Sequence, residues 1–411
     1  MGRRACALFL VVLCVSFVGA IAQRTLVVPV DYSTVEDAIE AALPGDVIEV
    51  FGGTYGETLV ITKSLTILGI PKESECGCGE RSVSIMPRDR DQPIIRIETD
   101  ETAEVIVEEL TIRGARRGSA IKVSGSGNLN LNSCRILEND VGLDATGDCT
   151  ISVRDCEFKA NDRYALSLAG NTSFAVEECF FVREAGLLEE GAVMLVGNDA
   201  SGVIQNCSIL GVAELDSPDV QDREGLPCAI GIQVNDRASL SVLGCQIQYP
   251  RGIGIQVNDR ASVSVSGCEI GYLCQGIALE GGNEILVKEN TFAACDQGSV
   301  VALSVNSEMT LSIIGNTVGS FGTPPVGCSP LAVLGGSFDS PIEVSDNVIG
   351  DIGACAPFDL HLESCQEVFD LELKFEGTIT GHGNTLSASY QGPAQYPIWG
   401  SPFWPEDFLK E

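Results

Sequence analysis

One segment of this chain occurs twice in succession, and this repeat constrains the fold more than any other feature. GIQVNDRASLSVLGCQI begins at Gly231 and GIQVNDRASVSVSGCEI begins at Gly254, so the copies are 254 − 231 = 23 residues apart. A period of this length, in which Val, Ile and Ser alternate between Gly and Asn-Asp turns, is typical of a solenoid of short β-strands. Because one unit cannot bury its apolar face alone, we expect neighbouring units to stack as coils.

The end of the repeat recurs along most of the chain as a short apolar strand that runs into a Cys or an Asn. The spacing between successive landmarks ranges from 156 − 134 = 22 to 245 − 207 = 38 residues. Short spacings predict a bare coil, and long ones predict a coil with an inserted loop, as at 212–227 and 323–330. Roughly a dozen coils, at about 4.8 Å per stacked strand, would form a rod about 55 to 60 Å long.

The landmark residues are expected to stack on one another inside the coil as a ladder of structural side chains. The alternative, a line of metal-binding thiols, fits less well because four members of the series are Asn. The ladder consists of Cys134, Cys156, Cys179, Cys207, Cys245, Cys268, Asn290, Asn316, Asn347 and Asn384.

Alternation along the strands predicts which side chains face inward. In the second copy of the repeat the interior positions are Ile255, Val257, Val263, Val265, Cys268 and Ile270, and the outer positions are Gln256, Asn258, Ser264 and Glu269. The composition agrees, because 45% hydrophobic residues with only 6% aromatic residues suit many thin coils better than one bulky core. The pattern continues without a linker over residues 23–390, which predicts one elongated domain.

Residues 1–22 have the pattern of a secretory signal peptide. A short basic start at Arg3 and Arg4 is followed by an apolar stretch and by Ala20-Ile-Ala22 as a cleavage site. We therefore expect a secreted or extracytoplasmic protein, in the periplasm or at the cell surface. The rest of the sequence contains no apolar run long enough to span a membrane.

The chain carries a net charge of −32, and removal of Arg3 and Arg4 with the signal would make it −34. So negative a body should repel nucleic acid, and anionic polysaccharides unless cations bridge the gap. One interpretation is a solvated acidic surface that keeps an apolar rod soluble. A sharper one is calcium bound by Asp236 and Asp259, which are equivalent positions one coil apart, with Asn235 and Asn258 beside them as ligand-binding residues. Arg237 and Arg260 follow in register and would neutralise the acids. No other cofactor is indicated.

The cysteines outside the ladder are candidates for disulfides in an exported protein. Cys274 and Cys295 lie shortly after two consecutive ladder positions, and Cys328 and Cys355 lie in loops of neighbouring coils. Each pair could form one bridge.

The two ends are expected to be covered, because a solenoid exposes its core there. At the N-terminal end, Ser33 followed by Glu36 predicts a capping box for a short amphipathic helix at about 34–43. At the C-terminal end, residues 391–411 form a Pro-rich and aromatic tail that holds both Trp residues of the chain, Trp399 and Trp404. We expect a lid over the last coil; the alternative is a platform on which sugar rings stack.

The stretch from Asp31, DYSTVEDAIEAALPGDVIEVFGGTYGETLVITKSLTILG, resembles the opening of the pectin-lyase-like right-handed parallel β-helix superfamily. It is similar in particular to the periplasmic copper-maturation β-helix proteins and their uncharacterised relatives. The resemblance implies an all-β protein, a single right-handed parallel β-helix with an N-terminal capping helix and a C-terminal tail. It implies no activity, because the superfamily holds enzymes, adhesins and inert rods.

None of the catalytic motifs of the enzymes in that superfamily is complete in this chain. Gly381-His382-Gly383 resembles the histidine tripeptide of polygalacturonases, but the partner acids are missing and the surroundings are those of an ordinary turn, so His382 is expected to be structural. The strings of pectin esterases and mannuronan epimerases are also absent, and the only acid and base set of the pectate-lyase type is the tandem pair at Asp236 and Asp259 with their arginines. The sequence thus favours a noncatalytic protein that binds a polysaccharide, a cell-envelope component or a partner surface, or that acts as a spacer. The alternative is a lyase or hydrolase of uronic-acid polymers with an unrecognised carboxylate site.

Overall fold

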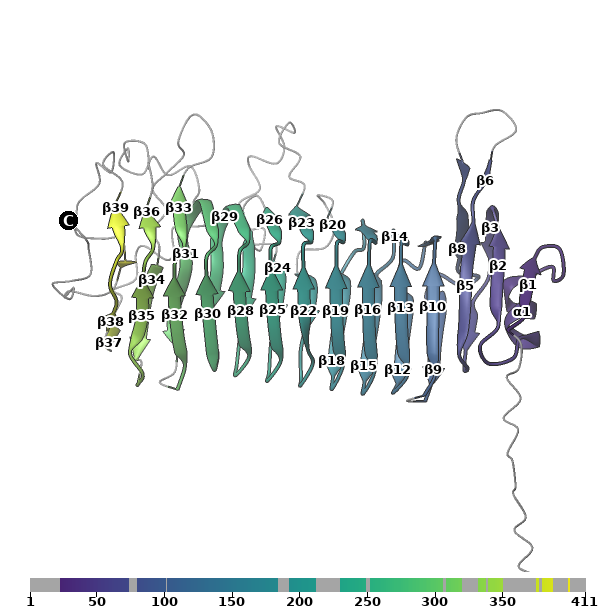
Figure 1. The fold of residues 1–411 in the computed structure, drawn as a ribbon, viewed down its shortest axis with the longest axis horizontal. Coiled ribbons are helices and arrows are strands. Elements are labelled where there is room, and N and C mark those ends of the chain that lie inside the picture. The colour runs from purple at the N-terminus through teal and green to yellow at the C-terminus, as the bar shows by residue number, and fades with distance from the viewer. Residues whose placement is uncertain are drawn as a thin grey trace, which may run out of the picture.

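The computed structural model describes residues 23–73, 80–100, 102–183, 192–211, 230–248, 252–305, 308–319, 332–337, 339–349, 375–376, 379–386 and 398–399. These residues form a long right-handed parallel β-helix in which almost every strand pairs with the equivalent strand of the coil before and after it. The all-β fold class predicted from the repeat is confirmed (Figure 1). The predicted signal peptide at 1–22 and the inserts at 212–227 and 323–330 lie outside the described residues.

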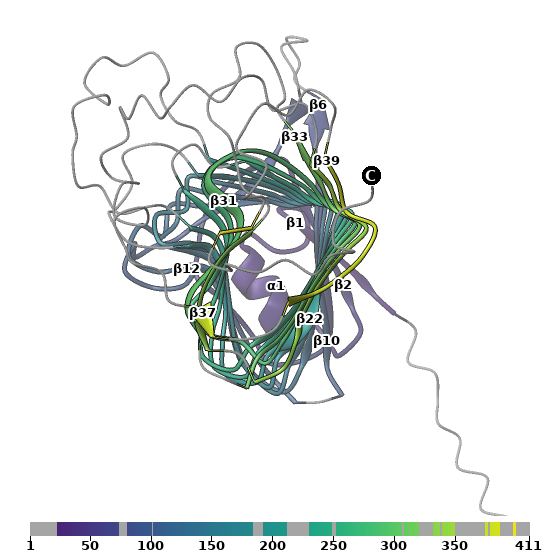
Figure 2. The same ribbon diagram turned by 90° about the vertical axis from the view of Figure 1, so that its left-hand side faces the viewer.

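Each coil contributes one strand to each of three faces, which enclose the core (Figure 2). The first sheet runs in the order β1 (Thr25–Val28), β2 (Val47–Phe51), β5 (Leu65–Ile70), β10 (Glu104–Glu108), β13 (Asn128–Asn132), β16 (Thr150–Arg154), β19 (Ser173–Glu177), β22 (Ser201–Gln205), β25 (Ser239–Leu243), β28 (Ser262–Ser266), β30 (Glu284–Lys288), β32 (Thr310–Ile314), β35 (Ile342–Ser345) and β38 (Ile379–Thr380).

The other two faces are two ladders that merge into a single sheet. The second ladder contains β3 (Gly53–Gly56), β8 (Val83–Met86), β11 (Leu110–Arg113), β14 (Arg135–Leu137), β17 (Glu157–Lys159), β20 (Phe180–Arg183), β23 (Ser208–Gly211), β26 (Gln246–Gln248), β29 (Glu269–Leu279), β31 (Thr291–Val305), β33 (Thr317–Gly319), β36 (Val348–Ile349) and β39 (Thr385–Leu386). The third ladder contains β4 (Leu59–Ile61), β9 (Ile95–Thr99), β12 (Ser119–Gly125), β15 (Val141–Gly147), β18 (Tyr164–Gly170), β21 (Ala192–Val196), β24 (Ile230–Val234), β27 (Ile253–Val257), β34 (Ala332–Ser337), β37 (Phe375–Glu376) and β40 (Ile398–Trp399). The ladders join because β29 and β31 run through the corner and pair in both.

The repeat places the core as alternation predicts. Ile255, Val257, Val263, Val265, Cys268 and Ile270 are all buried, so the interior half of the prediction is confirmed. Gln256 points outward from β27 as predicted, but it is only 9% exposed, less than the other outer positions. Burial of one such Ile or Val side chain stabilises the fold by about 1.5 to 3 kcal/mol, and the gain is repeated at every coil.

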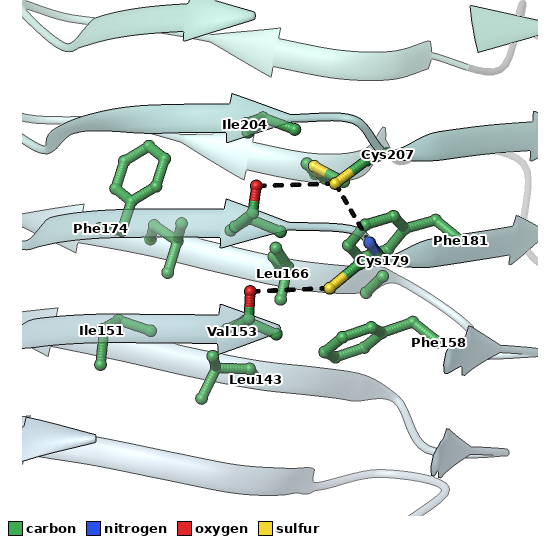
Figure 3. Packing of buried hydrophobic residues seen from close by; sticks show 14 of the residues in the cluster. Leu143, Ile151, Val153, Phe158, Leu166, Phe174, Cys179, Phe181, Ile204 and Cys207 are labelled. Carbon is green, nitrogen blue, oxygen red and sulfur yellow. Dashed lines mark hydrogen bonds between the residues drawn. The ribbon is translucent and has the colours of Figure 1, made fainter. Parts of the chain in front are cut away.

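The ladder residues occupy one corner, directly after the strands of the first sheet (Figure 3). The backbone N–H of Cys179 donates to Sγ of Cys207 at 3.4 Å, and the thiol of Cys207 donates to the carbonyl of Val176 at 3.6 Å. The same pattern continues through the Asn members, where the N–H of Asn316 donates to Oδ1 of Asn347 at 2.8 Å. Cys and Asn therefore fulfil the same role, an acceptor for the coil before and a donor to its carbonyl.

The thiol of Cys179 is unsuited to nucleophilic chemistry. A hydrogen bond with Cys156, together with burial, raises the pKa of Cys179 to about 12. The reactive thiolate is therefore scarce at neutral pH. Cys134, Cys156, Cys179, Cys207, Cys245 and Cys268 are all buried and form no disulfide.

A shorter row of stacked Asn side chains lies at the next corner and was not predicted from the sequence. Asn139 and Asn161 are buried, and the N–H of Asn139 donates to Oδ1 of Asn161 at 3.2 Å. The amide of Asn161 in turn donates to the carbonyl of Ile136 at 3.0 Å. Within the described residues this row has two members, which are too few to give a periodic signal in the sequence.

The helix α1 (Val35–Ala41) lies across the N-terminal end of the coil and buries Val35, Ala38 and Ile39 (Figure 2). The predicted capping box of Ser33 and Glu36 is wrong. The N-cap is Thr34, whose hydroxyl accepts from the N–H of Asp37, and Glu57 accepts from the N–H groups of Val35 and Glu36 at 3.2 and 2.8 Å. A carboxylate from the first coil thus takes the place of the local Glu, which ties the helix to the solenoid.

Asp46, at the turn after α1, should give this end of the rod a specific acid sensitivity. Arg24 donates to its carboxylate at 3.0 Å, the N–H of Leu43 donates at 2.7 Å, and these contacts lower the pKa of Asp46 to about 2. A carboxyl with a lowered pKa stabilises the fold fully above its ordinary pKa of 3.8, and this stabilisation is lost as the pH falls towards 2.

We therefore expect Asp46→Asn to lower the urea midpoint of unfolding at pH 6 and to have a smaller effect at pH 2.5. The matched control is Asp31→Asn, at an exposed carboxylate that accepts from the N–H of Val27. Equal destabilisation by Asp46→Asn at both pH values would contradict the assignment.

Candidate functional site

The outer side of the third ladder carries the most concentrated set of polar side chains that the sequence analysis singled out. We call this surface, formed by the outward side chains of β9, β12, β15, β18, β21, β24 and β27 with the residues that follow the last two, the third face. Its strands pair in register, so equivalent side chains form two rows along the rod. The first row is Arg96, Lys122, Asp144, Ser167, Leu195, Gln233 and Gln256, and the second includes Glu98, Ser124, Thr146, Ala169, Asn235 and Asn258.

The N-terminal part of the third face is charged. Arg96 pairs with Glu98 on its own strand, and Nζ of Lys122 lies 3.8 Å from Oδ2 of Asp144 on the next coil. Burial raises the pKa of Asp144, and Lys122 and Arg163 partly offset that effect. A carboxyl whose pKa is raised beside a cation is the kind of group that serves as a general acid. Sequence reasoning missed Asp144, although its alignment with Lys122 one coil earlier could have indicated it.

The C-terminal part of the third face is built from amides. Nε2 of Gln256 donates to Oε1 of Glu280 at 2.9 Å, and Nδ2 of Asn258 donates to Oδ1 of Asn235 at 2.7 Å. The remaining oxygens, Oε1 of Gln256 and Oδ1 of Asn258, are buried and accept no hydrogen bond. Buried polar atoms almost always find a partner, so two such acceptors, one on β27 and one directly after it, indicate a place where a ligand or water donates.

The candidate calcium ligands Asp236 and Asp259 are part of the turns that follow β24 and β27. Both have a left-handed backbone, with φ of 59° and 57°. Oδ2 of Asp236 accepts from the N–H of Asn198 at 2.8 Å, and Oδ2 of Asp259 accepts from the N–H of Asp236 at 3.1 Å. In each carboxylate, Oδ2 therefore accepts a hydrogen bond from the preceding coil, and Oδ1 is left for another partner.

The arginines that follow these aspartates do not pair with them in the structure. Arg237 donates two hydrogen bonds of 2.7 Å to Asp199, which lowers the pKa of that carboxyl, and Arg260 lies 3.7 Å from Glu308. Within the described ranges no three His, Cys, Asp or Glu side chains are grouped to hold a metal ion. Calcium at Asp236 and Asp259 remains a prediction.

The remaining candidate residues lie away from the third face or outside the described residues. Trp399 belongs to β40, which pairs with β34, while Trp404, Cys328 and Cys355 are not among the described residues. Cys295 is buried, with its thiol 3.8 Å from the carbonyl oxygen of Ala293, and the side chain of its proposed partner Cys274 is not described, so that disulfide stays a prediction. His382 is exposed between β38 and β39, where its backbone carbonyl accepts from the N–H of Asp346.

Three stacked faces, an end-capping helix and an internal side-chain ladder define a right-handed parallel β-helix. The chain belongs to the right-handed β-helix family, whose model, described as "Right handed beta helix region", matches residues 90–209, 190–349 and 230–392. No curated protein sequence matches the chain significantly. Among the described residues, no helix has the length and apolar character needed to cross a membrane.

Solved structures with a similar fold include three carbohydrate-active enzymes. The A-module of a mannuronan C-5 epimerase from Azotobacter vinelandii is 12% identical with a TM-score of 0.48, and the match covers 90% of this chain and 94% of that one. The catalytic unit of a thermostable α-1,3-glucanase from Streptomyces thermodiastaticus is 14% identical with a TM-score of 0.43, over 90% of this chain and 67% of that one. A pectin methylesterase from Aspergillus niger is 12% identical with a TM-score of 0.30, over 87% and 86%. At these identities and scores the likeness carries no information on activity.

Proposed function

We propose that this protein is an extracytoplasmic, noncatalytic β-helix that binds a glycan along its third face. The observation that carries the proposal is the pair of buried amide oxygens on Gln256 and Asn258 that accept no hydrogen bond. Sugars present hydroxyl and amine donors, which such acceptors can satisfy. Gln233 and Asn235 of one coil recur as Gln256 and Asn258 of the next, so a polymer lying along the rod would meet the same amides at two successive steps. The location outside the cytoplasm rests on the signal peptide predicted at 1–22.

Binding should depend on the third face and not on the equivalent coils of the first sheet. We expect Asn235→Ala combined with Asn258→Ala to weaken glycan binding about tenfold or more, because two hydrogen bonds worth about 0.5 to 1.5 kcal/mol each would be lost. The matched control is Ser241→Ala with Ser264→Ala, which removes polar groups from the outer side of β25 and β28 in the same two coils. A glycan array followed by isothermal titration calorimetry would measure both. Equal losses in the two double variants, or no bound glycan at all, would refute the proposal.

A second candidate function is hydrolysis or elimination on a uronic-acid polymer, and Asp144 is the observation that favours it. Its raised pKa and its place 3.8 Å from Lys122 suit a proton donor. Incubation with oligogalacturonates and oligomers of alginate, with and without Ca²⁺, would reveal turnover. Turnover that disappears in Asp144→Asn and persists in Asp148→Asn, at an exposed acid on the same coil, would replace the noncatalytic proposal with an enzymatic one.

A further inference from the structure

We call the C-terminal part of the third face, around Asn235, Gln256, Asn258 and Glu280, its amide end. It presents hydrogen-bond acceptors and negative charge but few donors, and this imbalance restricts the kind of ligand that can bind. The orientation of Gln256 is set by Glu280, because only the NH₂ group of the amide can donate to the carboxylate 2.9 Å away. Oε1 of Gln256 is therefore the atom left without a partner, on a residue that is only 9% exposed. A ligand at this point has to supply a donor.

The second unpartnered acceptor belongs to Asn258, which directly follows β27 and lies on the same side as Gln256. Gln256 and Asn258 alternate with Ile255 and Val257, which face the core, so the two amides lie on the same outer side. Glu280 joins them from the next coil, because it directly follows Leu279, which pairs with Val257. Two amide oxygens and one carboxylate thus lie close together at the end of β27.

The charges around these acceptors favour a cation over an anion. Asp199 and Glu308 are paired with Arg237 and Arg260. Among the described residues no ion pair joins Asp236, Asp259 or Glu280 to a cationic side chain. The local balance is therefore five carboxylates against two guanidinium groups, on a chain whose net charge is −32. An anionic polymer would be repelled here, and a protonated amine would be attracted.

We propose that the amide end of the third face selects glycans with free amino groups, such as oligomers of glucosamine, over neutral or uronic-acid glycans. The inference rests on the glycan-binding function proposed above and names its ligand class. An ammonium group offers three donors and no acceptor, which matches a site of unpartnered oxygens. Hydrogen bonds from a charged donor are also stronger than those from a sugar hydroxyl. A uronate brings further acceptors and negative charge, so it fits neither property.

The test compares four hexasaccharides by isothermal titration calorimetry at pH 6 and 0.15 M salt with EDTA present. These are the glucosamine hexamer, its fully N-acetylated counterpart, cellohexaose and hexagalacturonate. We expect the glucosamine hexamer to bind at least tenfold more tightly than each of the others. Tighter or equal binding of any of the other three would overturn the inference while leaving glycan binding intact, whereas absence of binding by all four would defeat the proposed function as well.

A charge-neutral variant separates a specific site from general attraction of a cationic sugar to an acidic protein. Gln256→Met removes the unpartnered acceptor, keeps a side chain of similar size and leaves the net charge unchanged. We expect it to weaken binding of the glucosamine hexamer about tenfold. Gln246→Met is the matched control, because Gln246 is an outward residue of β26 on the second ladder, and it should bind as the parent protein does. If Gln256→Met bound the hexamer as tightly as the parent protein, the attraction would be nonspecific and the inference wrong.

Discussion

Replacing Asn316 with alanine is expected to lower the free energy of unfolding by about 3 to 5 kcal/mol, because the change leaves several buried groups without a partner. Oδ1 of Asn316 accepts from the N–H and from the side-chain amide of Asn290 at 2.9 and 3.0 Å. Its own amide donates to the carbonyl of Val287 at 2.9 Å and to Oδ1 of Asn347 at 3.0 Å. Urea unfolding followed by circular dichroism would measure the loss.

The matched control for Asn316 is Cys207, which holds the same position in an earlier coil. Sulfur is a weak acceptor and the thiol a weak donor, so Cys207→Ala removes weaker contacts, those to Cys179 at 3.4 Å and Val176 at 3.6 Å. We expect less than half the loss found for Asn316→Ala. If both variants lost the same free energy, the ladder would contribute by filling space and not by hydrogen bonding.

Phe181→Ala should be about as damaging as the loss of Asn316, for a different reason. Phe181 is fully buried and stacks on Phe158 of the preceding coil, with ring centroids 5.0 Å apart and an interplanar angle of 15°. Deleting the ring leaves a cavity that the rigid coils on either side cannot close, at a cost of about 3 to 5 kcal/mol. Thermal or urea unfolding would measure it.

The neighbouring residue supplies an internal control for this experiment. Phe180 points outward from the same strand and is 42% exposed. Phe180→Ala should change the free energy of unfolding by about 0.5 kcal/mol or less. A large effect of Phe180→Ala, or a small one of Phe181→Ala, would mean that Phe180, and not Phe181, faces the core.

The period of the sequence was enough to predict the solenoid and its interior, because stacking in register turns a spacing along the chain into a neighbour in space. The alternation of β27 and β28 correctly placed Ile255, Val257, Val263 and Val265 inside. It did not predict that Gln256 is covered, because burial of an outward side chain depends on neighbouring coils, and the hydrogen-bond partner of Gln256, Glu280, belongs to the next coil. The contribution of Glu57 to the start of α1 was missed for the same reason, because this carboxylate comes from the first coil and not from α1.

The functional site was harder to predict than the fold, because an outward polar residue looks the same in the sequence whether it is solvated or placed for a ligand. Asp236 and Asp259 stood out through their repetition, yet the structure gives each a hydrogen bond from a backbone N–H of the preceding coil. Asp144 is not part of a repeated segment, and its raised pKa arises from burial that only the packed coils create. The sequence could select the edge of the rod that carries Asn235 and Asn258 but not the atoms that lack a partner.

The uniform corner also explains how a molecule like this can change length over evolution. Each ladder side chain accepts a hydrogen bond from the backbone N–H of the ladder residue one coil earlier, and its own N–H donates to the ladder side chain one coil later. This holds for Cys268 and for Asn290 alike. A duplicated stretch of 23 residues could therefore be spliced in without disturbing the geometry on either side, and the twin segments at Gly231 and Gly254 are what one such event would leave behind. Each further duplication would lengthen the outer surface by one coil, and a glycan bound as proposed would gain one more set of contacts.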